Sequence, residues 1–289
     1  MRSTFTFAQR ILIAALVGAL IALPATPRTG GIAHAQDAAA KKDVDTALII
    51  AVDASESVDE ERFRLQMDGI AQALEDPDVL NTFISGTYGG ILFSLVVWSD
   101  KSTIAVPWIR IGSKADADKL AARVRALPRT AGEYTCLARM LRNLSETLVP
   151  EVRENWSKYA RIVIDVSGDG PDNCSNRPTL EGIREELAFN GITINGLPVV
   201  TDPDQLVGVT AYMAPGATME MRTARKYFPE AVTLEEWYRQ HVISGAGGFV
   251  VPAEGYQDFG RAMRRKFVLE ISQAIKAPWR RNPRTIVKR

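Results

Sequence analysis

The chain has 289 residues, and its 35 lysines and arginines nearly balance its 34 aspartates and glutamates, which gives a formal net charge of +1. This balance is not the basic footprint of a nucleic-acid-binding protein, so no nucleic acid is expected as a partner. Only two cysteines and two histidines are present, which argues against a zinc site built from these residues.

The N-terminus has the pattern of a cleaved secretory signal. Its first residues are basic, the apolar run at 11–23 is too short to span a bilayer comfortably, and the small residues Ala33 and Ala35 follow. The competing interpretation, a membrane anchor, is disfavoured by this short run and by Pro24. We expect cleavage after Ala35, a periplasmic or secreted location, and no stable membrane insertion of the mature chain.

The rest of the chain has the length of one α/β domain with insertions. Residues 36–44 are expected to form a linker, residues 45–276 a single domain, and residues 277–289 a basic tail. Residues 201–233, which are irregular and rich in Pro and Met, are expected to be an insertion in this domain.

Within the domain, apolar runs typical of buried strands alternate with amphipathic segments typical of helices. Strands are predicted at 46–52, 89–99, 101–111, 159–170, 192–200 and 247–253. Helices are predicted at 59–76, 113–127, 134–149, 177–191, 233–244 and 256–275. Pro107 fits an edge strand better than a central one. The alternation predicts an α/β fold, with a doubly wound, mostly parallel sheet flanked by helices.

Oxygen-bearing side chains lie at the ends of two predicted strands and at the start of one helix. They are Asp53, Ser55 and Ser57 in "VDASES", Thr135, and Asp169. Ligands of doubly wound sheets bind at the carboxyl ends of the strands, so we expect these side chains to meet there. Gly168 and Gly170 are expected to allow a tight turn that brings Asp169 close. Oxygen ligands suit Mg²⁺ or Mn²⁺, with Ca²⁺ as a third candidate.

A helix cap is the alternative explanation for part of this pattern. Ser57 and Glu60 have the spacing of a capping box before an amphipathic helix, which is worth ~1 kcal/mol. This interpretation accounts for Ser57 but not for Asp53, Ser55 or Asp169, and both roles can coexist at Ser57.

The five residues, taken in order, resemble the metal-ion-dependent adhesion site of von Willebrand factor A domains. The resemblance covers about residues 44–200 and extends more loosely to 275. The segments "VIDVSGDGPDN" and "ITINGLPV" look closer still to a bacterial branch of exported A-like domains whose function is not established. The resemblance implies a Rossmann-like fold in which the serines and the threonine contact the metal and the aspartates act partly through bound waters. It also implies that a carboxylate of a partner protein completes the coordination of the ion.

The surroundings of the site depart from that family. Glu133 and Tyr134 stand where small residues are usual, and Glu133 either reaches the metal or repels an acidic partner. Asp172 and Asn173 are candidates for the rim, although such residues more often satisfy turn backbone.

Both cysteines flank the proposed site. We expect a disulfide between Cys136 and Cys174, with two unrelated buried thiols as the alternative.

The sequence therefore favours an exported, divalent-cation-dependent protein-binding module that holds an acidic group of its partner. One alternative is a metal-dependent hydrolase or phosphatase that uses Asp53. Position 55 weakens it, because phosphatases of this kind usually have a second aspartate there, and no complete catalytic constellation is visible. The other alternative is a structural envelope protein with a vestigial site.

Overall fold

The computed structural model describes residues 43–130, 132–156, 159–207 and 231–276. The predicted signal peptide, the linker up to residue 42, residues 208–230 of the predicted insertion and the basic tail lie outside the described residues.

The centre of the fold is a five-stranded sheet with the strand order β3-β2-β1-β4-β5. The strands are β1 (Val44–Asp53), β2 (Ile91–Trp98), β3 (Ser102–Ile111), β4 (Tyr159–Gly168) and β5 (Ile192–Pro198). All neighbours pair in parallel except β2 and β3, which are antiparallel. The predicted fold class is confirmed, and the strand that contains Pro107 lies at an edge.

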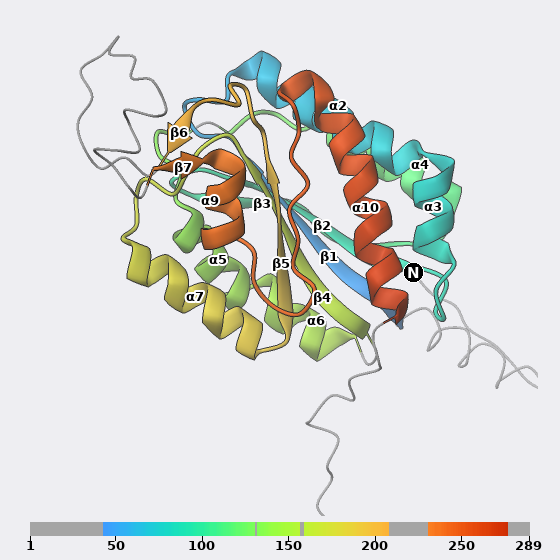
Figure 1. Cartoon of the computed structure of the whole chain (residues 1–289). Coiled ribbons are helices and arrows are strands. Elements are labelled where there is room, and N and C mark those ends of the chain that lie inside the picture. Colours follow the sequence, from blue (N-terminus) through green and yellow to red (C-terminus); the bar gives the residue numbers. More distant parts are fainter. Residues whose placement is uncertain (1–42, 131, 157–158, 208–230, 277–289) are drawn as a thin grey trace, which may run out of the picture.

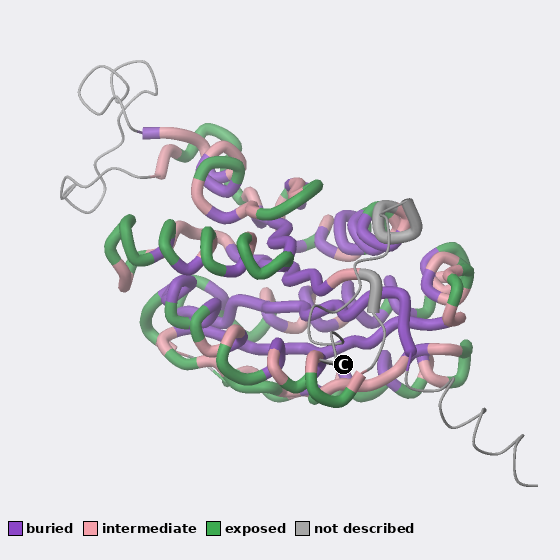
Figure 2. Tube along the Cα trace, turned by 90° about the horizontal axis from the view of Figure 1, so that it is seen from below, coloured by how far each residue is buried: buried purple, intermediate pink, exposed green. Residues whose placement is uncertain are grey.

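Helices cover both faces of this sheet (Figure 1). One face packs against α2 (Glu60–Glu75), α3 (Pro77–Ile84), α4 (Lys114–Arg125) and α10 (Phe259–Lys276); the other packs against α5 (Leu137–Glu146), α6 (Leu148–Asn155), α7 (Arg177–Phe189) and α9 (Leu234–His241). Along β1, side chains alternate between the two cores: Leu48 and Ile50 join the first, and Ala47 and Ile49 the second. Figure 2 shows the buried strands between helices whose outer sides are exposed.

Three elements differ from the sequence prediction. The segment 134–149 is not one helix, because α5 ends at Glu146 and α6 begins at Leu148; Pro150 lacks an N–H and would clash within a continuous helix. A short helix, α3, was not predicted, although Asp76 caps it and Pro77 occupies its first turn.

The predicted strand at 247–253 is the third difference. This segment runs beside β5 and forms only isolated bridges, at Val250 and Ala253. Gly247 has a positive φ, and Pro252 has no N–H to donate, so a regular ladder does not form. After it come η1 (Tyr256–Asp258) and α10.

The predicted insertion begins and ends in a small ladder. Strand β6 (Leu206–Val207) pairs antiparallel with β7 (Val232–Thr233). Thr233 then caps α9, because its side chain accepts a hydrogen bond from the N–H of Glu236.

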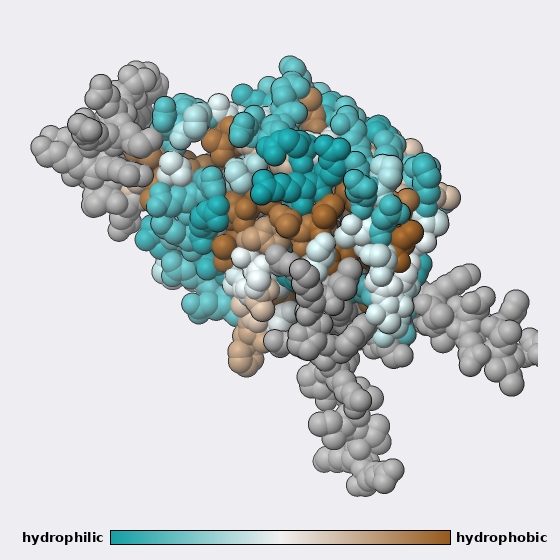
Figure 3. All heavy atoms as spheres, turned by 45° about the vertical axis from the view of Figure 1, so that its right-hand side comes forward, coloured by the Kyte–Doolittle hydropathy of each residue, from teal (hydrophilic) through white to brown (hydrophobic). Residues whose placement is uncertain are grey.

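The surface of the described part has polar and apolar areas. Figure 3 shows one face on which hydrophilic residues border an apolar area. The large hydrophobic side chains that are exposed come from separate elements: Ile104, Tyr134, Phe189 and Leu269. No helix within the described ranges is long and apolar enough to cross a membrane.

A buried ionic cluster lies between α10 and the sheet. Lys266 is fully buried, and its Nζ lies 2.7 Å from Asp165 Oδ1 and 2.9 Å from Glu270 Oε1. The side-chain amide of Asn195 also donates to Glu270 Oε1, at 2.9 Å. Burial, and then the charge of Glu270, raise the pKa of Asp165 well above its usual value, whereas Lys266 lowers it. This cluster joins β4, β5 and α10, and the sequence analysis did not foresee it.

Candidate metal centre

The first part of the site is the turn that follows β1. Asp53 is the last residue of β1 and is fully buried, and its Oδ1 accepts a hydrogen bond of 2.8 Å from the N–H of Ser55. The hydroxyl oxygens of Ser55 and Ser57 are 3.2 Å apart. The alternate spacing in "VDASES" therefore places one carboxylate and two hydroxyls in a single turn.

Asp169, just after the end of β4, meets this turn. Ser57 Oγ donates to Asp169 Oδ1 at 2.6 Å, although the two residues are 112 positions apart in the chain. Because β1 and β4 are parallel neighbours, their carboxyl ends reach the same edge of the sheet. The structure thus brings Asp53, Ser55, Ser57 and Asp169 together.

The capping box predicted for Ser57 is wrong. Helix α2 begins at Glu60, and its N-cap is Asp59, whose carboxylate accepts from the N–H of Arg62 at 2.8 Å. Ser57 lies too far before the first turn to cap it. Its hydroxyl is therefore available to the candidate metal centre.

Thr135 lies at the same edge, just before α5. It is mostly buried; its N–H donates to Asn173 Oδ1 at 2.9 Å, and its carbonyl accepts from the N–H of Asn173 at 3.1 Å. The loop just before it is tied to the Asp53 turn, because Gly132 N–H donates to the carbonyl of Ala54 at 3.4 Å. Among the described residues, no hydrogen bond joins the Thr135 hydroxyl to the other four predicted ligands.

The predicted disulfide is present. Cys136 follows Thr135, Cys174 follows Asn173, and the two cysteines are bonded. The bridge joins positions separated by 38 residues, which in the chain-entropy model stabilises the fold by about 3–4 kcal/mol. It fixes the loop of Thr135 to the loop that follows Asp169.

The predicted rim residues have different roles. The carboxylate of Asp172 accepts hydrogen bonds from the backbone N–H groups of Ala138, Cys174 and Ser175. Glu133 is exposed, and its carboxylate beside Tyr134 raises the pKa of that phenol.

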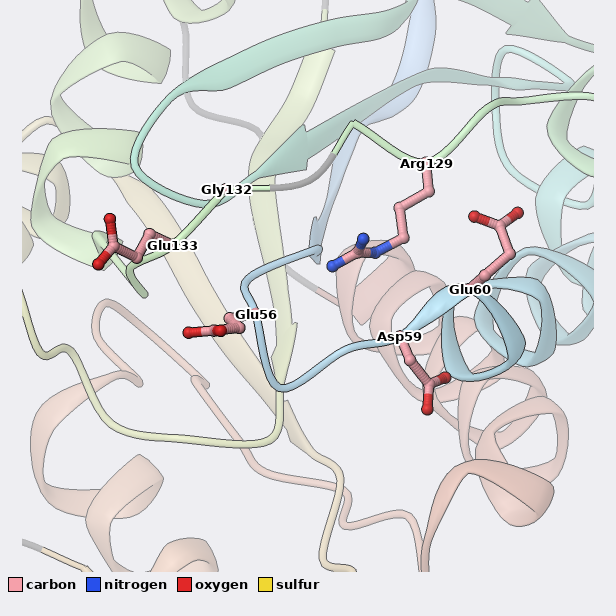
Figure 4. Close-up of a pocket in the computed structure, with 6 residues that line it drawn as sticks. All are labelled: Glu56, Asp59, Glu60, Arg129, Gly132 and Glu133. Carbon is pink, nitrogen blue, oxygen red and sulfur yellow. The ribbon is translucent and has the colours of Figure 1, made fainter.

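An open pocket of about 480 Å³ lies beside the turn. Its lining residues are Glu56, Asp59, Glu60, Arg129, Gly132 and Glu133 (Figure 4). Arg129 reaches the turn and donates to the carbonyl of Ser55 at 3.1 Å. Four of the six lining residues carry a carboxylate and one a positive charge, so the rim of the site is mainly acidic. The carboxylates of Glu56 and Glu133 point away from Arg129 in Figure 4.

Asp53 has a buried carboxylate oxygen, Oδ2, without a hydrogen-bond partner among the described residues. The pKa of Asp53 is raised to about 7, because burial and the charge of Asp169 raise it by more than the hydrogen bonds from Ser55 and Ala54 lower it. A proton or a cation would relieve this cost, and the two compete for the same carboxylate.

The donor atoms fit a hard cation. No cluster of three or more His, Cys, Asp or Glu side chains in the described ranges is arranged to hold a metal ion. The available donors are two carboxylates and neutral hydroxyls. Oxygen donors of this kind suit Mg²⁺ or Mn²⁺.

The family of the chain follows from its sequence over nearly the whole described region. A family model described as "Protein of unknown function (DUF1194)" matches residues 43–275. The chain belongs to the DUF1194 family. No curated protein matches the DUF1194 chain significantly.

Several solved structures are similar to the DUF1194 chain. Proximal thread matrix protein 1 from the mussel byssus, with a zinc-occupied MIDAS motif, is 16% identical over 79% of this chain and 46% of its own, with a TM-score of 0.49. A von Willebrand factor type A protein from Catenulispora acidiphila is 14% identical over 80% of this chain and 43% of its own, with a TM-score of 0.45. BatB from Bacteroides thetaiotaomicron is 15% identical over 80% of this chain and 100% of its own, with a TM-score of 0.47. The DUF1194 chain spans about half of the mussel protein.

Residues outside the motif loops also reach the site, and no sequence pattern had indicated them. Tyr256 Oη donates to Asp169 Oδ2 at 2.9 Å, and Arg62 Nη1 lies 3.9 Å from the same oxygen. Tyr238, on α9, is buried near Asp53, Asp169 and Asp165; burial and then their charges raise its pKa well above the usual value. No local motif identifies Tyr238 and Tyr256, because packing of the C-terminal segments places them.

Gly168 is required for a different reason from the one predicted. Neither Gly168 nor Gly170 has a positive φ, so a special turn conformation is not the cause. A Cβ at Gly168 would lie 2.9 Å from both Asp53 Oδ2 and Tyr238 Oη, whereas a Cβ at Gly170 would meet nothing within 4 Å.

We therefore expect Gly168→Ala to lower the free energy of unfolding by about 1–3 kcal/mol through overpacking. Urea denaturation in EDTA measures this, with Gly170→Ala as the matched control that should unfold like the wild type. Equal destabilisation by both substitutions would contradict the close approach at Gly168.

Proposed function

We propose that this DUF1194 protein is an exported binding module that uses a divalent cation, Mg²⁺ or Mn²⁺, to hold an acidic group of a partner protein. The observation that carries the proposal is the convergence of Asp53, Ser55, Ser57 and Asp169. The unpartnered, buried oxygen of Asp53 adds to it, because a buried carboxylate without a partner costs free energy unless a ligand compensates it.

The proposed cation would supply a Lewis-acidic centre at the carboxyl end of β1. Ser55 and Ser57 would offer neutral hydroxyl oxygens, and Asp53 would balance part of the charge. Thr135 is the remaining candidate ligand, from the loop before α5. Because most of these donors are neutral, the ion would keep enough positive charge to attract a carboxylate of the partner.

Features of the rim support protein binding over turnover. Tyr134 is 45% exposed directly beside Thr135, and exposed aromatic side chains are common anchors in protein interfaces. Position 55 has a hydroxyl, whereas a phosphatase that used Asp53 would need an acid/base carboxylate there. The disulfide supports the proposed export, because disulfides persist mainly in oxidising compartments.

Calorimetric titration of Mn²⁺ into the metal-free protein tests the proposal. We expect one site per chain, with Mg²⁺ as a competitor. Water-proton relaxation of the Mn²⁺ complex should then reveal an exchangeable water at the position reserved for the partner. Absence of binding by Mn²⁺ and Mg²⁺ would reject the cation-dependent module, and a bound ion without exchangeable water would reject its role in capturing a partner.

A further inference from the structure

Asp169 is held at both of its oxygens. Oδ1 accepts the hydrogen bond from Ser57 Oγ at 2.6 Å, and Oδ2 accepts one from Tyr256 Oη at 2.9 Å. Its side chain is 7% exposed, so water competes little for either oxygen. The position of this carboxylate is therefore determined by two hydroxyl donors from opposite ends of the domain.

Tyr256 is suited to act as a permanent donor. It lies in η1 and is mostly buried. Its hydroxyl donates to the carboxylate of Asp169, and a hydrogen bond to a charged acceptor is stronger than one between neutral groups.

Arg62 contacts both Tyr256 and the turn of Ser57. Its guanidinium lies 5.4 Å from the centre of the Tyr256 ring, as in a cation–π contact. Its Nη1 also donates to the carbonyl of Ser57 at 2.5 Å. Arg62 thus links the Tyr256 ring to the turn that carries the candidate ligands.

The fixed carboxylate has a consequence for Ser57. A hydroxyl has one proton and two acceptor lone pairs. Because the Ser57 proton is directed at Asp169 Oδ1, Ser57 accepts from Ser55 in their 3.2 Å contact, and its second lone pair remains available for a cation. A carboxylate that rotated freely would not impose this orientation on Ser57.

We propose that Tyr256 is a positioning residue of the candidate metal centre, which orients Asp169 through its hydroxyl and, through Asp169, the cation-binding hydroxyl of Ser57. This inference rests on the proposed cation site and extends it to a residue outside the motif loops. Partners that orient metal ligands in this way typically contribute ~10–100-fold to metal affinity.

The test compares Mn²⁺ binding by the wild type, Tyr256→Phe and Tyr88→Phe. We expect Tyr256→Phe to raise the dissociation constant roughly tenfold or more and to change the electron paramagnetic resonance spectrum of bound Mn²⁺. Tyr88→Phe removes a phenolic hydroxyl from the loop before β2, at the opposite end of the sheet from the site, and it should change neither quantity.

A purely structural role predicts a different outcome, because phenylalanine keeps the ring beneath Arg62. If Tyr256→Phe binds Mn²⁺ with wild-type affinity and spectrum, the positioning role is rejected while the cation site stands. If the wild type binds no Mn²⁺, the proposed function fails and this inference fails with it. Melting temperatures in EDTA establish that each variant is folded at the temperature of the titration.

Discussion

Replacing Asp53 by asparagine is expected to weaken the binding of Mn²⁺ and Mg²⁺ by more than about a hundredfold. Outer partners of metal ligands contribute ~10–100-fold, and Asp53 is the buried carboxylate at the centre of the proposed donor set. The same substitution removes a buried charge whose Oδ2 has no partner among the described residues. In EDTA the variant should therefore be at least as stable as the wild type.

Asp59→Asn is the matched control for this experiment. It also removes one carboxylate from the segment between β1 and α2, and asparagine remains a good N-cap for α2. Calorimetry should give wild-type affinity for Asp59→Asn. If both variants lost comparable affinity for the cations, the effect would come from the general acidity of the turn. That result would contradict a specific role of Asp53.

Replacing Lys266 by methionine is expected to lower the free energy of unfolding by about 3–5 kcal/mol. Lys266 is the cation between the fully buried Asp165 and Glu270. Removing one partner of a buried ion pair leaves uncompensated charge, which is the costly change. Methionine keeps much of the volume, so the loss reports mainly on charge rather than on a cavity.

Arg265→Met, at the neighbouring exposed position of α10, controls for the loss of a positive charge from the helix. Surface substitutions usually change the free energy of unfolding by no more than about 0.5 kcal/mol. Urea denaturation of both variants gives the comparison. A Lys266→Met variant no less stable than Arg265→Met would show that the ionic cluster does not stabilise the packing of α10.

The sheet could be predicted because its strands are continuous apolar runs. A parallel strand buried on both faces needs apolar side chains at successive positions, and β1 and β2 satisfy this almost throughout. The prediction was less accurate for the segments outside the central sheet. Pro150 divides the helical segment after Thr135 into α5 and α6, and the segment 247–253 forms isolated bridges in place of a strand.

The candidate site was predictable in part for a similar reason. Asp53 and Asp169 follow neighbouring parallel strands, so the topology alone brings them to one edge of the sheet. The contact from Tyr256 depends on how η1 and α10 pack against α2, 87 positions from Asp169 in the sequence. No periodicity or local spacing encodes such a contact, and the same is true of Lys266 with Asp165.

The most direct test of the account is the anomalous diffraction of Mn²⁺ in crystals of the protein grown with the ion. A single strong anomalous peak is predicted between the hydroxyls of Ser55 and Ser57, near Asp53 and within reach of Thr135. The assignment of the metal centre would be contradicted if these side chains were ordered and no such peak appeared. It would also be contradicted if the anomalous peak lay elsewhere on the chain.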